Sequence, residues 1–144
     1  MSSLEIGEDH HVARYCKPSA IGDDGLPLAT AFELRDGEDY LSVNWLEFFK
    51  ASDLSQTIDF VRQAFRKKKF GVSSNGKFVS LQVSKVKKVI LRNSHLPAEI
   101  IHLPDEENDP SHSGIFGYTA SDELISTEIA ELAHAKDMHQ GKLP

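Results

Sequence analysis

The decapeptide DPSHSGIFGY (109–118) places one histidine between two serines and frames them with a proline and a glycine. Histidine is the side chain that changes charge near neutral pH, so His112 is the first candidate for acid–base chemistry. Asp, Ser and Gly at this spacing also favour a compact turn that needs no ligand. We therefore expect a turn, and we hypothesise that His112 lines a polar pocket, with Ser111 and Ser113 as supporting hydrogen-bond donors.

Two predicted strands supply the other candidates for catalysis. Segment 10–16 (HHVARYC) is expected to be a strand, and segment 40–45 (YLSVNW) alternates as a second one. If both strands meet the 109–117 segment in one cleft, the chain would be a small enzyme acting on a nucleotide-like substrate. The residues around that cleft would be His11, Arg14, Ser42, Asn44 and His112.

The seven histidines do not form a recognisable metal site. His10 and His11 are adjacent, so they point to opposite faces of a strand, and His134 and His139 are not at the four-residue spacing of a helical pair. The single cysteine excludes a cysteine-rich zinc site. A glycine-rich phosphate loop is also missing from the sequence. The sequence therefore predicts neither a bound metal nor a cofactor.

Charge is unevenly distributed along the chain. The net charge is −6, yet residues 62–92 contain ten basic and no acidic residues, and the rest carries six basic and twenty-two acidic ones. Arg62, Arg66 and Lys69 form one stripe at helical spacing, beside the apolar face of a predicted helix. Two interpretations stay open. The basic segment binds an anionic partner, or it pairs with the acidic flanks of the same chain.

A small binding or accessory module is the favoured function. It would engage a protein partner or a phosphate-bearing ligand through a basic helix–hairpin surface that includes Arg62, Arg66 and Lys69. Nucleic acid is a less favoured partner, because we expect no exposed aromatic residues among these charges. Phe60 lies opposite the apolar stripe of the same helix, where it marks a partner contact or a second packing face.

Length and composition are typical of one soluble domain spanning residues 1–144, with frayed termini. No apolar run approaches the roughly 20 residues that cross a bilayer. The acidic N-terminal segment lacks the apolar stretch of a secretory signal. Cys16, the single cysteine, suits a reducing compartment. We expect a cytoplasmic protein that does not contact a membrane.

Periodicity predicts two main helices and a sheet. Asp53 and Gln56 mark the start of the first helix, with Leu54 opening its apolar stripe, and the second helix is expected to begin near Ser121. The pair Asn75-Gly76 separates two alternating runs, which is a strong hairpin signal. These elements together favour an α+β fold with a mostly antiparallel sheet packed by two main helices.

Four shorter segments complete the expected fold. Residues 31–34 are predicted to form a strand piece, residues 84–93 a short helix capped by Ser84 with a strand as the alternative, and residues 98–104 a further strand. Residues 105–114 are expected to be a long polar loop, and the tail from residue 137 onward to fray.

Four motifs stand out along the chain: RYCKPS (14–19), GLPLATAF (25–32), ELRDGEDYLSVNWLEFF (33–49) and DPSHSGIFG (109–117). Together they resemble a set of short uncharacterised bacterial proteins. That resemblance implies a bacterial origin, and it does not indicate a particular activity. His11, Arg14 and Ser42 can also be fitted to positions of the ADP-ribosyltransferase folds, although the intervening spacing is too short and no glutamate is placed for catalysis.

Overall fold

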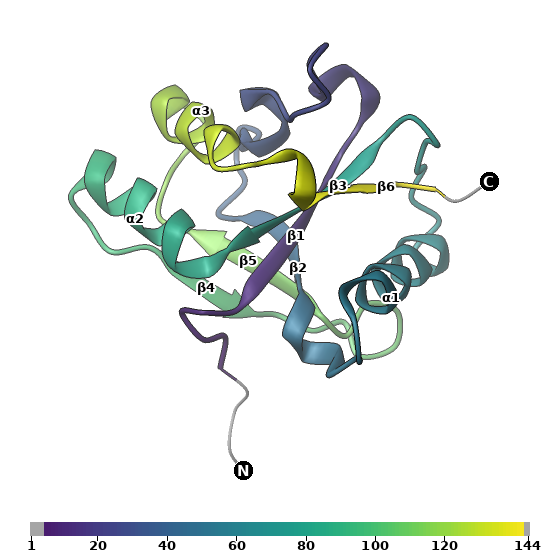
Figure 1. Ribbon diagram of the computed structural model, residues 1–144. Coiled ribbons are helices and arrows are strands. Elements are labelled where there is room, and N and C mark those ends of the chain that lie inside the picture. Colours follow the sequence, from purple (N-terminus) through teal and green to yellow (C-terminus); the bar gives the residue numbers. More distant parts are fainter. Residues whose placement is uncertain (1–4, 143–144) are drawn as a thin grey trace.

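The structure is a computed structural model that describes residues 5–142 (Figure 1). Six strands form one antiparallel sheet in the order β4-β5-β2-β1-β3-β6. The strands are β1 (His11–Cys16), β2 (Leu41–Trp45), β3 (Lys77–Gln82), β4 (Glu99–His102), β5 (His112–Phe116) and β6 (Met138–Gln140). The α-helices are α1 (Leu54–Lys67), α2 (Val83–Ser94) and α3 (Glu123–Glu131). Short 3-10 helices are η1 (Pro18–Ala20), η2 (Ala29–Phe32), η3 (Leu46–Phe49) and η4 (Ala135–Asp137).

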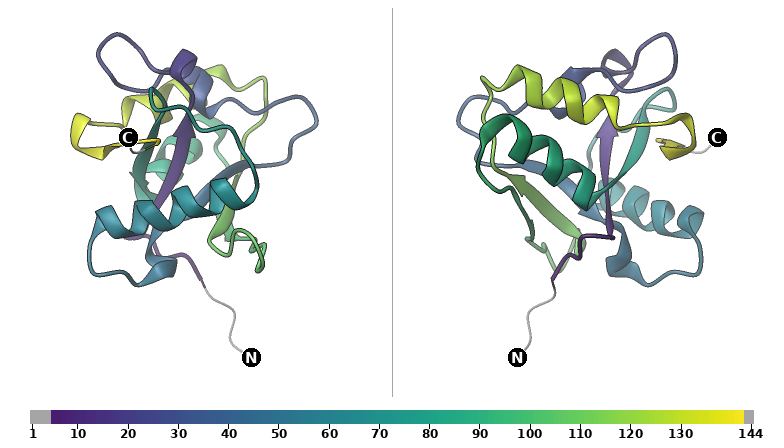
Figure 2. Two further views of the ribbon diagram at one scale, coloured as in Figure 1. Left: turned by 90° about the vertical axis from the view of Figure 1, so that its right-hand side faces the viewer. Right: turned by 60° about the vertical axis from the view of Figure 1, so that its left-hand side comes forward.

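Helices cover both faces of the sheet unequally. α2 and α3 lie side by side on one face, and α1 lies on the other (Figure 2). The α2–α3 face holds the larger apolar core, which includes Val79 and Ile115. The α1 face holds a smaller cluster, in which Ile58 and Val61 of the helix join Phe78 of the sheet. The predicted α+β class with a mostly antiparallel sheet is confirmed, and the short helix expected at residues 84–93 forms α2.

Strand β3 is buried on both faces. Val79 packs on the α2–α3 side and Phe78 on the α1 side, and both side chains are 0% exposed. Its two neighbours in the sheet are β1 and β6 rather than the preceding segment. The hairpin predicted around residues 75–76 is therefore wrong, because β3 pairs with strands that are distant in sequence.

Tyr15 explains how the 73–76 segment is held without a partner strand. The Ser73 amide donates a hydrogen bond to the Tyr15 hydroxyl (2.9 Å). A Cβ on Gly76 would lie only 2.1 Å from that oxygen, so glycine is required for this close approach. The Asn-Gly pair therefore serves packing against an aromatic ring and not a hairpin turn.

The predicted helices are confirmed, with changes at their ends. Asp53 caps α1 by accepting a hydrogen bond from the Gln56 amide (2.8 Å), but Leu54 is half-exposed and lies outside the apolar stripe. α2 follows β3 directly, so its N-cap is Gln82 and the predicted Ser84 cap is wrong. α3 begins at Glu123, close to the expected start.

Three other segments differ from the sequence prediction. Residues 29–32 form η2 instead of a strand piece, because Phe32 turns into the core and its carbonyl accepts a hydrogen bond from the Tyr118 hydroxyl. Residues 112–116 form strand β5 between β2 and β4, not the end of a loop. Residues 138–140 pair with β3, so this part of the tail is ordered, while the expected fraying of residues 1–4 and 143–144 lies outside the described residues. Within residues 5–142, no helix has the length and apolar character needed to span a bilayer.

Candidate functional site

A cleft of about 690 Å³ opens where β1 and β2 stop pairing. The two strands pair only through Val12–Trp45 and Ala13–Asn44, whereas on their other edges β1 pairs with β3 along its whole length and β2 pairs with β5 from Leu41 to Asn44. We call this opening the β1–β2 cleft. Its walls come from β1, β2, β5, the 30–35 segment and the C-terminal end of α1. It has the size of a small-molecule site, for which several hundred cubic ångströms are usual.

Arg14 spans the gap between the two strands. Its Nη1 donates to the Ser42 carbonyl (2.9 Å) and its Nε donates to the Ala31 carbonyl (2.8 Å). Burial lowers the pKa of Arg14 from its ordinary value, and the nearby Tyr118 partly opposes this. A guanidinium nevertheless stays charged at neutral pH. Arg14 therefore places a positive charge in the cleft wall and fixes the backbone of Ser42.

Ser42 and His112 lie on one face of the paired strands β2 and β5. His112 Nε2 is 3.3 Å from Ser42 Oγ, and His112 Nδ1 is 2.9 Å from the Leu103 carbonyl. Because a carbonyl oxygen only accepts hydrogen bonds, Nδ1 must carry the proton. In the neutral ring, Nε2 then presents its lone pair to the serine hydroxyl.

Asn44 belongs to a buried polar network on the cleft floor. Its Nδ2 donates to Asp109 Oδ1 (2.7 Å) and to Ser111 Oγ (2.9 Å). The second carboxylate oxygen of Asp109 accepts a hydrogen bond from Lys68 at the end of α1. Asp109 is 0% exposed, so this carboxylate depends on both partners. The network joins the 105–111 loop to the C-terminal end of α1.

Seven of the seventeen residues that line the cleft are cationic or aromatic. Arg14, Lys17, Arg35 and Lys68 line it, against one acidic residue, Glu33. Phe70 also lines the cleft and is 53% exposed, and the Lys68 ammonium lies 4.6 Å from its ring centre. The expectation that no aromatic residue is exposed among the basic ones is therefore wrong for Phe70. The site combines positive charge with an open aromatic surface.

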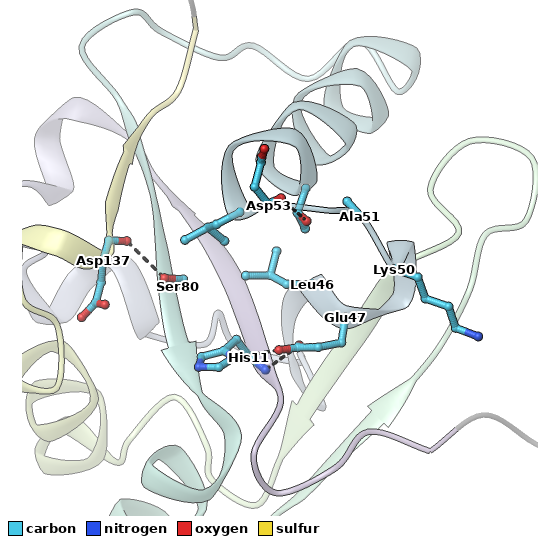
Figure 3. A pocket seen from close by; sticks show the side chains of 10 residues that line it. His11, Leu46, Glu47, Lys50, Ala51, Asp53, Ser80 and Asp137 are labelled. Carbon is cyan, nitrogen blue, oxygen red and sulfur yellow. Dashed lines mark hydrogen bonds and ion pairs between the residues drawn. The ribbon is translucent and has the colours of Figure 1, made fainter.

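His11 lies in a second cavity, of about 450 Å³, beside the first turn of α1 (Figure 3). Its Nδ1 is 2.7 Å from Glu47 Oε2, and its backbone amide donates to the other oxygen of Glu47 (2.7 Å). Ser80 also lines this cavity and donates to the Asp137 carbonyl (3.5 Å), whereas the Lys50 side chain extends away from it (Figure 3). Of the five residues proposed to share one cleft, Arg14, Ser42, Asn44 and His112 do so, and His11 does not.

The predicted basic stripe is not one exposed surface. Arg62 is 8% exposed and donates to the Gln140 carbonyl through Nε (3.0 Å) and Nη2 (2.6 Å), while Nη1 pairs with Asp59. Arg66 and Lys69 remain exposed. Because the hairpin is also missing, the predicted helix–hairpin surface does not exist in that form.

Ion pairs connect the basic segment 62–92 to acidic residues outside it. The pairs are Arg62–Asp59, Lys68–Asp109, Lys87–Glu8 and Arg92–Glu128. They agree with the interpretation that this segment complements the acidic flanks of the same chain. Phe60 likewise has an internal partner, since its ring stacks on Phe49 with centres 4.9 Å apart.

Ser111 and Ser113 are both fully buried. Ser111 Oγ accepts from Asn44, and Ser113 Oγ donates to the Ser111 carbonyl (3.0 Å). Neither hydroxyl faces the cleft, so their predicted role as ligand donors is corrected to a structural one. The sequence analysis did not identify Lys68 and Phe70 as cleft residues. The RKKKF run at 66–70 indicates a cluster of positive charge, but it does not show which of these side chains point into the cleft.

No metal centre is formed by the side chains of residues 5–142, where no group of three or more His, Cys, Asp or Glu residues comes together. The chemistry available to the β1–β2 cleft is anion binding by its cations and proton transfer through His112. Comparison of the chain with protein-family models, with curated proteins and with solved structures found no match.

Proposed function

We propose that this protein binds a phosphate-bearing small molecule of nucleotide size in the β1–β2 cleft. The observation that carries the proposal is the charge of the walls: four cationic side chains and one acidic side chain line the cleft, and even with Lys68 paired to Asp109 a positive excess remains, in a molecule whose net charge is −6. Focused positive charge of this kind attracts anions and is strengthened by the low-dielectric walls around it.

Shape supports the same ligand class. The cleft volume of about 690 Å³ accommodates a nucleotide and exceeds what a lone phosphate ion needs. Phe70 offers an aromatic face on which a base can stack, and stacking of this type is typical of nucleotide-binding proteins. Arg14 and Lys68 are held in place by their internal hydrogen bonds, so they are positioned before a ligand arrives.

Calorimetric titration with adenosine 5′-diphosphate at low salt tests the proposal. We expect binding that weakens as salt rises, and markedly weaker binding of adenosine, which lacks the phosphates. Arg35→Glu should weaken ADP binding about tenfold, which corresponds to about 1.4 kcal/mol.

Lys88→Glu is the matched control, because it makes the same charge change at an exposed position of α2, on the opposite face of the sheet. Equal weakening by both variants would assign the effect to net charge and contradict a site at the cleft. Absence of ADP binding to the wild-type protein at low salt would also reject the proposal.

A further inference from the structure

We propose that Ser42 and His112 are a nucleophile and its general base, and that the cleft transfers an acyl group from a phosphate-bearing carrier to Ser42. The inference rests on the proposed phosphate-binding function, since the cations would hold the carrier while the serine reacts. A serine hydroxyl becomes a useful nucleophile when an adjacent base removes its proton and a third group orients that base. All three parts are present at this site.

The orientation of the base is set by the backbone. The Leu103 carbonyl accepts from His112 Nδ1 (2.9 Å), and the Leu103 amide donates to the His112 carbonyl (2.9 Å). The backbone contact fixes the position of His112 beside Leu103, and the Nδ1 contact holds the ring in the tautomer whose Nε2 is free to accept a proton from Ser42. The 3.3 Å separation of Nε2 and Oγ is typical of a pair that shortens when substrate binds.

The scaffold around the pair is rigid. Ser42 pairs with Gly114 and Asn44 pairs with His112 in the β2–β5 ladder, so the two reactive side chains sit on adjacent paired strands. Gly114 allows the Tyr40 ring to lie against β5, since a Cβ there would be 2.5 Å from Tyr40 Cδ2. The Tyr40 ring in turn contacts the edge of the His112 ring, with centres 6.0 Å apart. Ser42 itself is exposed, so an incoming substrate can reach its hydroxyl.

The proposed reaction has two steps, acylation of Ser42 and hydrolysis of the acyl-serine. Ser42 Oγ attacks the carbonyl carbon of an ester or thioester, its proton passes to His112 Nε2, and an O–C bond forms. The bond from that carbon to the carrier oxygen or sulfur then breaks, and the carrier leaves with the proton from His112. Water then attacks the carbon of the acyl-serine and gives its proton to His112 Nε2. The bond from that carbon to Ser42 Oγ breaks, Ser42 recovers the proton from His112, and the carboxylic acid leaves. The charge of Arg14, which is held 2.9 Å from the Ser42 backbone carbonyl, would favour the negative charge that develops on the substrate carbonyl oxygen.

Two acyl donors test the pair and the substrate class separately. p-Nitrophenyl acetate carries no phosphate, whereas acetyl-coenzyme A carries its acyl group on a carrier that contains an ADP unit. We expect a burst of product equal to the protein concentration, and mass spectrometry of peptides should locate the acetyl group on Ser42. Ser42→Ala should abolish the label, and His112→Asn should slow acylation about a hundredfold.

Controls use residues of the same type away from the cleft. Ser55→Ala removes an exposed serine of α1, and His95→Asn removes an exposed histidine just after α2; both should acylate like the wild-type protein. Thermal unfolding midpoints would show that Ser42→Ala and His112→Asn are folded.

Each failure has a distinct meaning. ADP binding without acylation of Ser42 by either donor would overturn the nucleophile–base pair and leave the proposed function standing. Acylation by p-nitrophenyl acetate without ADP binding would reject the proposed function and the phosphate-bearing substrate class. A label that forms at the wild-type rate in His112→Asn would show that His112 is not the base.

Discussion

The two faces of the sheet differ in what they bury and in what they leave open. The strands present apolar side chains to α2 and α3. Among these side chains are Val43 of β2, Leu81 of β3 and Ile115 of β5. Toward α1 the same strands present polar groups, among them Ser42, Asn44 and Ser80. The His11 cavity lies on that side, and the β1–β2 cleft borders it through Phe65 and Lys68 while also reaching Ala31 and Leu34 of the larger core.

Geometry accounts for this division. Strands lie about 4.8 Å apart, so six of them span roughly 24 Å, whereas a helix is only about 10 Å wide. Two helices cover such a face and one does not. α1 therefore leaves a cavity near its first turn and the β1–β2 cleft near its last turn. The face covered by α2 and α3 holds the larger apolar core, and the face covered only in part by α1 leaves polar side chains accessible to a ligand.

The largest expected loss of stability comes from breaking the apolar packing of β2. Trp45 is buried, ends the alternation of Leu41 and Val43, and donates from its indole nitrogen to His10 Nδ1 (3.1 Å). Trp45→Ala should lower the free energy of unfolding by about 3–5 kcal/mol. Urea denaturation followed by circular dichroism measures this, with Leu124→Ala, at an exposed position of α3, as the control. A wild-type midpoint in Trp45→Ala would contradict the register of β2.

A slightly smaller loss is expected on the polar face, when the buried carboxylate is removed. Asp109→Ala leaves Lys68 without its partner and the Asn44 amide without one of its acceptors, which should cost about 3 kcal/mol. The same denaturation experiment measures it. Glu8→Gln, which removes the exposed partner of Lys87, should change the midpoint little. An equal effect of the two substitutions would argue against a structural role for the Asp109 network.

Thiol reactivity reports how tightly the apolar face is closed. Cys16 is fully buried on that face, and burial raises the pKa of its thiol to about 11, although Arg14 partly opposes the rise. The thiol is therefore protonated at pH 8. We expect its reaction with a disulfide reagent to be at least about a hundredfold slower in the native protein than in urea. Rapid modification of the native protein would show that this face opens readily.

The smallest expected effect is a pH dependence at the edge of the α1 face. Burial, and secondarily Arg62, lowers the pKa of His139 from its ordinary value of 6.5, while Asp137 opposes the shift. As pH falls below about 6.5, the unfolded chain takes up this proton before the native protein does, so stability is lost as pH falls through the lower native pKa.

His139→Gln should therefore show a shallower decrease in unfolding free energy below pH 6.5 than the wild-type protein, as measured by urea denaturation at several pH values. His95→Asn, at an exposed position just after α2, is the control. Identical pH profiles for His139→Gln and the wild-type protein would mean that folding does not change the pKa of His139.

Local signals in the sequence were sufficient for several elements. The alternation in segment 10–16 and the Leu41–Val43–Trp45 pattern predicted β1 and β2, and the Asp53 cap predicted the start of α1. These signals are reliable because the alternation of a strand and the capping of a helix depend only on residues that are close together in the sequence.

Long-range partners account for the incorrect predictions. Nothing local to residues 112–116 shows that they lie between β2 and β4, where they form a strand instead of a loop. The Asn75-Gly76 pair has the chemistry of a hairpin turn, yet both edges of β3 are already paired, with β1 and with β6, so the preceding segment has no edge of β3 to join.

In the candidate site too, some features follow from the sequence and others depend on long-range contacts. Residue types alone identified Arg14, Ser42, Asn44 and His112 as a group that would matter if their segments met, and they line one cleft. The other positions depend on the tertiary structure. His11 lies in the other cavity, and Ser111 and Ser113 are buried. Arg62 donates to the Gln140 carbonyl, whereas Lys68 and Phe70 line the cleft. The physical reason is that side-chain chemistry is a property of each residue, whereas the direction in which a side chain points depends on strand pairing and packing with residues far along the chain.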